Sequence, residues 1–265
     1  MASELGIEHL MHANVGDKTG QQRIAGGVRA LPGEFPWMVS LQRMLLTRGN
    51  HVCGGTILNN FHVLTAGECF WFYENSRYRI QAGKLLLNSL EATEQTMNVL
   101  RFTLHPLYDG SASPYNLAVV RTASPFGYTA FISPITLPSI DSIPEGVVSI
   151  SGWGQTASGP FQSMSTELQM FHVPIMPNNV CQITVGGSIG SGPVTDRNVC
   201  LGPGTGGIGT CGGDAGGAAV QRILGQDVIV GVISWPVSTC GQEGFPSITT
   251  RVSAFVEWIN LNSQI

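Results

Sequence analysis

The sequence has few charged residues and no long apolar run. Only 11% of its 265 residues are charged, and the formal net charge is −4, from 13 basic and 17 acidic side chains. The basic residues form no cluster, which disfavours binding to nucleic acids or other polyanions. Because no stretch of 18 apolar residues occurs, we expect no membrane-spanning helix and no membrane partner.

The sequence also lacks paired metal or redox cysteines and glycosylation sequons. An even number of widely spaced cysteines indicates disulfide bonds and an oxidising compartment, although the count alone does not fix their pairing. The first twenty residues contain no apolar signal core, so we expect a secreted protein whose signal peptide has been removed or is missing from this sequence. The cysteines are Cys53, Cys69, Cys181, Cys200, Cys211 and Cys240.

What the sequence does contain is typical of an all-β protein. Hydrophobic residues make up 43% of the chain, and 34 glycines and 15 prolines separate short apolar runs such as "FPWMVSLQ", "VVSISGWG" and "DVIVGVISW". Such spacing favours a sandwich or barrels. The single helix that we expect lies at the C-terminus, in "VSAFVEWINLNS", with Ser253 as a possible cap and the apolar face on the second half of the domain.

Several motifs, in this order along the chain, resemble the trypsin/chymotrypsin-like serine proteases. They are "RIAGG", "CGGTILNNFHVLTAGEC", "YNLAVV", "SGWG", "CGGDAGG" and "TRVSAFVEWI", and they span about residues 24–263. The resemblance implies two orthogonally packed six-stranded antiparallel β-barrels with the active-site cleft between them. It places a leader or activation peptide at 1–23 and the protease domain at 24–265. Within that domain it places barrel 1 at about 24–140, barrel 2 at about 141–252 and the helix at about 253–263. It also implies the disulfides Cys53–Cys69, Cys181–Cys200 and Cys211–Cys240.

The positions that carry the family's catalytic triad are changed in this sequence. The chemistry needs an imidazole base, a carboxylate that orients it and a hydroxyl nucleophile. Where the resemblance places these groups, this chain has Glu68, Asn116 and Ala215. In a comparable triad the loss of the base or the nucleophile alone costs about 10⁶ in turnover, so we predict no detectable proteolysis.

The substrate pocket implied by the resemblance is also altered. Gly209 stands at the position that selects the substrate side chain, so no charge there favours Lys or Arg. Pro236 replaces a glycine whose N–H binds the substrate backbone, and proline has no N–H to donate. Ser247 replaces a glycine that lines the pocket. These changes predict damaged substrate binding.

Other parts of the family's machinery are retained. Gly213 and Ala215 can still offer the backbone N–H pair of the oxyanion hole. Cleavage after Arg23 would free the α-amino group of Ile24, which the resemblance pairs with Asp214. The alternative is that the Arg23–Ile24 junction is inherited from the family and is not used in this protein.

The sequence therefore predicts a secreted, non-catalytic serine protease homologue that acts by protein binding, as a cofactor, decoy or inhibitor in a proteolytic or immune cascade. The expected partners are proteases or cascade components, together with the protease that cleaves after Arg23. An inactivated chymotrypsin- or elastase-like endopeptidase and an abundant secretory protein without a specific role are the alternatives. We expect no cofactor and no metal.

Two further groups of residues have open interpretations. The aromatic cluster "CFWFYEN", from Cys69 to Asn75, is either an interaction patch or partly buried against the first barrel. The histidines are expected to be surface or packing residues that do not repair the triad. They are His9, His12, His51, His62, His105 and His172.

Overall fold

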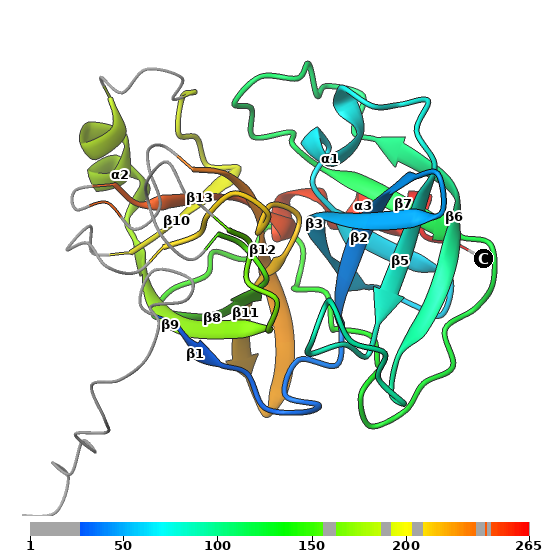
Figure 1. Ribbon diagram of the computed structural model, residues 1–265. Coiled ribbons are helices and arrows are strands. Elements are labelled where there is room, and N and C mark those ends of the chain that lie inside the picture. The colour runs from blue at the N-terminus through cyan, green and yellow to red at the C-terminus, as the bar shows by residue number, and fades with distance from the viewer. Residues whose placement is uncertain are drawn as a thin grey trace, which may run out of the picture.

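The structure, a computed structural model, describes residues 27–155, 163–186, 192–202, 209–236, 242 and 245–264. Two closed six-stranded antiparallel β-barrels lie side by side (Figure 1). This confirms the fold expected from the sequence. No helix within the described ranges is long and apolar enough to cross a membrane.

The first barrel contains the strands between residues 38 and 122. Its closed order is β2-β3-β4-β7-β6-β5. Its strands are β2 (Met38–Leu45), β3 (Arg48–Ile57), β4 (His62–Thr65), β5 (Tyr78–Ala82), β6 (Gln95–Leu104) and β7 (Ala118–Thr122).

The second barrel contains the strands that follow residue 146, in the closed order β8-β9-β10-β13-β12-β11. A short strand, β1 (Val28–Arg29), pairs with β9, so this part of the expected first half belongs to the sheet of the second barrel. The barrel strands are β8 (Val147–Gly152), β9 (Gln169–Met176), β10 (Asn198–Leu201), β11 (Ala218–Ile223), β12 (Gln226–Pro236) and β13 (Ser247–Arg251).

Strand formation follows the β-branched and turn-forming residues of the sequence. β7 reads AVVRT and is buried along almost its whole length, because one face fills the barrel and the other is covered. β11 and β12 are joined by Leu224 and Gly225, both at positive φ (49° and 81°), as a two-residue hairpin turn requires.

Two helices were not expected from the sequence. α1 (Glu68–Trp71) follows β4, and α2 (Asn178–Val185) follows β9, so the prediction of a single helix was wrong. The α2 sequence, NNVCQITV, holds four β-branched residues, which have low helix propensity. Tertiary contacts stabilise α2 instead, through the Cys181–Cys200 disulfide and hydrogen bonds from the Asn178 amide to the carbonyls of Thr195 and Asn198.

The C-terminal helix is shorter than expected and begins as a 3-10 turn. Residues Val252–Phe255 form η1, and α3 (Val256–Asn262) continues from it. The expected cap was wrong: Ser253 lies inside the 3-10 turn, where its hydroxyl donates to the Ser142 carbonyl at 2.6 Å.

This segment packs on the second half, as expected, and on the first barrel as well. Phe255 and Ile259 join a core cluster that includes residues of both barrels. The Asn59 amide, which follows β3, donates to the Ser263 carbonyl at 2.8 Å. α3 crosses behind the first barrel in Figure 1. The terminal segment therefore helps to hold the two barrels together.

Two of the three expected disulfides are confirmed. Cys53–Cys69 joins β3 to α1, and Cys181–Cys200 joins α2 to β10. Cys211 is also disulfide-bonded, while its expected partner, Cys240, lies outside the described residues.

Candidate functional site

Glu68 and Asn116 form a reciprocal hydrogen-bonded pair in the first barrel. Glu68 begins α1, and Asn116 lies in the turn just before β7. The Glu68 backbone N–H donates to Asn116 Oδ1 at 2.9 Å, and Asn116 Nδ2 donates to Glu68 Oε1 at 3.1 Å. Asn116 is buried and Glu68 is half-buried. The structure thus brings together two of the three residues expected at the triad positions.

Burial of this pair changes the ionisation of Glu68. Desolvation raises the pKa of the Glu68 carboxyl to about 7, although the hydrogen bond from Asn116 lowers it. Tyr108 is the ionisable neighbour, and the pKa of its phenol is raised by burial and then by the charges of Glu68 and Asp109. Near neutral pH, Glu68 can therefore hold or release a proton.

Ala215 lies in a glycine turn that connects to β11 of the second barrel. Gly213 (φ 95°) and Gly216 (φ 82°) have backbone conformations that favour glycine. A Cβ on Gly216 would meet the Thr65 hydroxyl and the Gly54 carbonyl, so the turn has no room for a side chain there. The methyl group of Ala215 is the side chain that this turn presents, and it is partly exposed.

Asp214 anchors this turn from inside the second barrel. Its carboxylate accepts the Gly154 N–H at 2.8 Å and the Cys211 N–H at 2.9 Å, and the residue is fully buried. Burial raises the pKa of Asp214 to about 7, while the two backbone hydrogen bonds lower it. The expected activation residues Arg23 and Ile24 lie outside the described residues.

Backbone contacts place the Ala215 turn against the first barrel. The Gly54 N–H, on β3, donates to the Ala215 carbonyl at 2.8 Å. Thr65, at the end of β4, packs against Gly216, and its buried hydroxyl donates to the Gly54 carbonyl at 2.8 Å. Since Thr65 precedes α1 by three residues, these contacts bring the Glu68 pair and the Ala215 turn to the same barrel junction.

His51 is a junction residue whose role the sequence did not indicate. Its ring bonds the Ser40 hydroxyl at 2.8 Å and the Gly213 carbonyl at 3.0 Å, so it links the first barrel to the turn. Burial lowers the pKa of His51 to about 4, although the bond to Gly213 raises it, so the ring is neutral at physiological pH. The signal available in the sequence was its position two residues before Cys53.

The two N–H groups expected to form an oxyanion hole belong to the Ala215 turn. Among the described residues, neither the Gly213 N–H nor the Ala215 N–H has a hydrogen-bond acceptor. The exposed surface at Gly212 and the partial exposure of Gly213 keep this side of the turn accessible. A carbonyl or carboxylate oxygen of a ligand is the group that such donors bind.

Two of the three residues expected to line the substrate pocket pair across strands of the second barrel. Ser247, the first residue of β13, is buried, and its hydroxyl accepts the Thr210 N–H at 3.0 Å. This bond joins Ser247 to the segment that begins at Gly209. Pro236 pairs with Ser247 in the β12–β13 register. Ser247 therefore lies beside Pro236 and is bonded to Thr210, which follows Gly209 in the sequence; that these residues line a substrate pocket stays a prediction.

The aromatic cluster after Cys69 divides between core and surface. Phe70 is fully buried and stacks on Phe102 with ring centroids 4.1 Å apart. Phe72 and Tyr73 are 76% and 51% exposed, and the Arg43 guanidinium lies 3.7 Å from the centre of the Tyr73 ring. Burial against the first barrel therefore holds for Phe70, while Phe72 and Tyr73 are exposed and their role as an interaction patch stays a prediction.

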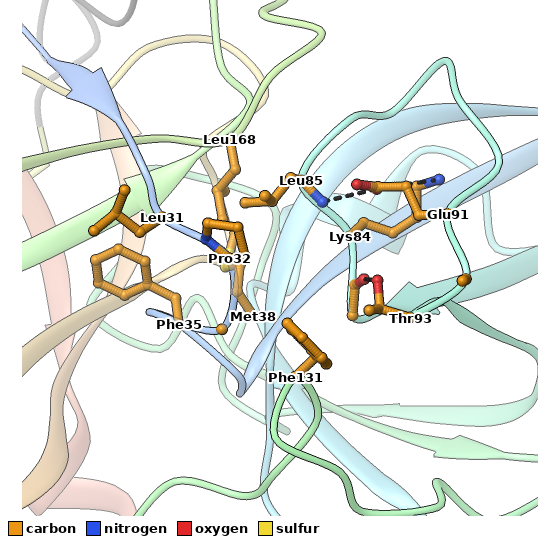
Figure 2. A pocket seen from close by; sticks show the side chains of 13 residues that line it. Leu31, Pro32, Phe35, Met38, Lys84, Leu85, Glu91, Thr93, Phe131 and Leu168 are labelled. Carbon is orange, nitrogen blue, oxygen red and sulfur yellow. Dashed lines mark hydrogen bonds and ion pairs between the residues drawn. The ribbon is translucent and has the colours of Figure 1, made fainter.

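A separate pocket of about 340 Å³ lies beside the loop between β5 and β6 (Figure 2). Its lining shares no residue with the barrel junction described above. Leu31, Pro32 and Phe35 approach from one side, while Lys84, Leu85 and Glu91 approach from the loop. Within the described residues, no cluster of three or more His, Cys, Asp or Glu side chains could hold a metal ion.

Comparison with known proteins establishes the class of this protein. The family model described as Trypsin matches residues 24–259, and the chain belongs to this family of serine proteases. It is 32% identical to Trypsin-1 of Astacus astacus over 243 residues, which cover 91% of this chain and all of that protein.

Two larger relatives match over nearly the whole of this chain but only part of their own length. Transmembrane protease serine 9 of Rattus norvegicus is 34% identical over 259 residues, or 97% of this chain and 23% of that protein. Serine proteinase stubble of Drosophila melanogaster is 31% identical over 245 residues, or 90% of this chain and 31% of that protein.

Proposed function

We propose that this chain is a secreted, non-catalytic member of the trypsin family that acts by binding protein. The observation that carries the proposal is Ala215, whose methyl group stands in the glycine turn to which the family resemblance assigns the nucleophile. A methyl group can neither attack a carbonyl nor exchange a proton.

The neighbouring groups do not replace the missing nucleophile. The Thr65 hydroxyl, which packs against this turn, is buried and already donates to a backbone carbonyl. The cysteines of the described residues are all disulfide-bonded, so no thiol is available there. Glu68 and Asn116 bond one another, and their pairing supports the view that they no longer orient a base.

The pocket residues support a loss of ordinary substrate binding. The Ser247 hydroxyl is occupied by the Thr210 N–H, and uncharged Gly209 offers no ion pair to a substrate side chain. Pro236 removes one backbone donor that the family would offer to a bound peptide. We propose that this chain binds protein partners and acts as a cofactor, decoy or inhibitor in a proteolytic or immune cascade.

Cleavage after Arg23 is part of the same proposal. Asp214 is fully buried with two backbone donors, and a newly freed Ile24 α-amino group would supply it with a counter-charge. Treatment with trypsin followed by N-terminal sequencing tests this step. A new terminus at any residue other than Ile24 contradicts it.

The central experiment measures hydrolysis by the cleaved protein, after contaminating proteases have been inhibited and removed. Fluorogenic peptides with Ala, Phe or Arg before the scissile bond should give no signal above buffer. Hydrolysis in proportion to the concentration of this protein would overturn the proposal.

A restored variant separates this function from its alternative. In the triple variant Glu68→His, Asn116→Asp and Ala215→Ser, the triad chemistry is complete. Robust cleavage by this variant favours an inactivated chymotrypsin- or elastase-like endopeptidase. Continued inactivity indicates that the pocket, with Pro236 and Ser247, has also lost substrate binding.

A further inference from the structure

Glu68 is held in a fixed position at the barrel junction. Its backbone N–H and its Oε1 atom are both bonded to the side chain of Asn116, at 2.9 and 3.1 Å. Asn116 is itself buried and receives support from its backbone bond to the Ser113 carbonyl. A carboxyl group that is already ordered loses little conformational entropy when a ligand binds it.

The described residues supply no positive charge to Glu68. Its hydrogen-bond partner is Asn116, which is neutral, and its ionisable neighbour Tyr108 is neutral or negative. The ion pairs of the described residues involve other acids, and Glu68 takes part in none of them. The basic members of those pairs are Arg29, Lys84, Arg197, Arg222 and Arg251.

The missing counter-charge has an energetic cost that a ligand can remove. A partly desolvated carboxylate without a cation is unfavourable, and this is why burial raises the pKa of Glu68 to about 7. A cation placed beside the free oxygen would favour the ionised form and recover this cost. The second oxygen of Glu68 has no hydrogen-bond donor among the described residues.

Aromatic residues next to Glu68 favour an organic cation. Trp71, one turn along α1, is half-buried and packs edge-on against Tyr108 with ring centroids 5.4 Å apart. Gly110 leaves no room for a Cβ beside the Trp71 ring, which fixes the position of the indole. A carboxylate beside an indole is a suitable receptor for an ammonium or guanidinium group.

On these grounds we infer that Glu68, with Trp71 beside it, binds the cationic end of a lysine or arginine side chain that a protein partner presents at the barrel junction. The inference rests on the proposed binding function and names the chemistry of the partner. The free N–H groups of Gly213 and Ala215 on the facing turn are suited to a backbone carbonyl of the same partner segment.

The experiment compares two labelled peptides that differ only in charge, Ac-Ala-Ala-Arg-Ala-amide and the same peptide with citrulline in place of arginine. At pH 8 we expect the arginine peptide to bind at least about tenfold more tightly, because Glu68 is ionised. This preference should shrink as the pH falls below about 7, where Glu68 takes up its proton. Calorimetry or fluorescence anisotropy measures the affinities.

Two variants identify the residue responsible. Glu68→Gln keeps the shape of the side chain and should remove the preference for arginine at every pH. Glu257→Gln, the same change on α3, should leave the preference unchanged. Equal binding of the two peptides up to millimolar concentration, or a preference that survives in Glu68→Gln, overturns the inference.

A second measurement requires no variant. In protein labelled with ¹³C at glutamate carboxyls, N-acetyl-arginine amide should lower the titration midpoint of Glu68, while N-acetyl-citrulline amide should not. An unchanged midpoint with both compounds contradicts the inference. Mass spectrometry of the peptide separates the two proposals. A cleaved peptide overturns the proposed function, whereas an intact peptide that binds without regard to charge overturns only the inference made here.

Discussion

Two charged sites of the first barrel, at Lys84 and at Glu68, differ in whether the charged side chain has a partner of opposite charge. The Lys84 side chain is 1% exposed, and its ammonium nitrogen lies 2.5 Å from Glu94 Oε2 and 3.7 Å from Glu91 Oε2. Glu68 is also desolvated, but its bonded partner is the neutral amide of Asn116. The first site is complete without a ligand and ties the loop between β5 and β6 together, whereas the second lacks a counter-charge.

This difference separates a structural role from a binding role. Removing one member of a complete buried ion pair leaves uncompensated charge, so it should reduce stability strongly. Changing a residue at a site that lacks its counter-charge should reduce stability less. Such a change should mainly alter ligand binding and the way stability depends on pH. The predictions below test this contrast, from the largest expected effect to the smallest.

The largest effect is expected for Lys84→Met. The carboxylates of Glu91 and Glu94, 18% and 14% exposed, would then face each other without a cation, and the free energy of unfolding should fall by about 3–5 kcal/mol. Urea denaturation with the disulfides intact measures this change. Arg222→Met, which breaks the exposed pair Arg222–Asp227, is the control and should cost less than about 1 kcal/mol. Equal losses in the two variants would contradict a structural role for the Lys84 cluster.

An intermediate effect is expected for Asp214→Asn. The amide can accept one of the two N–H groups of Gly154 and Cys211, but its NH₂ group would face the other, so we expect a loss of about 2 kcal/mol. The exposed Asp141, which has a positive φ that asparagine tolerates, provides the control Asp141→Asn. If both changes leave the urea midpoint unaltered, the carboxylate of Asp214 is not needed to hold the turn.

The smallest effect on stability concerns the pH dependence caused by Glu68. Its folded pKa of about 7 lies above the ordinary value of 4.5, so the unfolded state releases its proton first as the pH rises. The resulting stabilisation is complete below pH 4.5 and is lost progressively as the pH rises through about 7. Glu68→Gln should remove this loss of stability between pH 4.5 and 7. Asn116→Ala should move the loss to higher pH, because the hydrogen bond that lowers the pKa of Glu68 is absent.

Unfolding free energies measured at several pH values test this prediction. Asp214, whose pKa is raised in the same direction, contributes to the wild-type profile, so the quantity to compare is the difference between wild type and Glu68→Gln. Glu257→Gln on α3 is the matched control. A difference that does not change between pH 4.5 and 7 would show that burial does not affect the ionisation of Glu68.

The sequence predicted the architecture because local patterns and global fold agree in the barrels. Short β-branched runs such as that of β7 became strands, and the two disulfides within the described residues joined the cysteines expected. α2 was missed because its residues have low helix propensity, and the forces that stabilise it come from Cys200, Thr195 and Asn198.

The candidate site was predictable in its residues but not in its bonding. The positions of Glu68, Asn116 and Ala215 followed from motifs, yet the reciprocal bonds between Glu68 and Asn116 depend on two segments 48 residues apart. His51 was expected to be a surface or packing residue, because a single sequence does not reveal that its ring reaches the Gly213 carbonyl 162 residues away. Sequence patterns therefore did not predict the contacts between the two barrels.

The aromatic contacts of the C-terminal segment determine when the chain can finish folding. His105 stacks on Tyr115 with ring centroids 5.1 Å apart, and Phe255 and Trp258 complete this cluster. During synthesis the last two rings emerge from the ribosome only after all strands of the second barrel. The faces of His105 and Tyr115 that these rings cover must therefore stay uncovered until translation has passed α3, so the first barrel cannot complete its packing before the whole chain has been made.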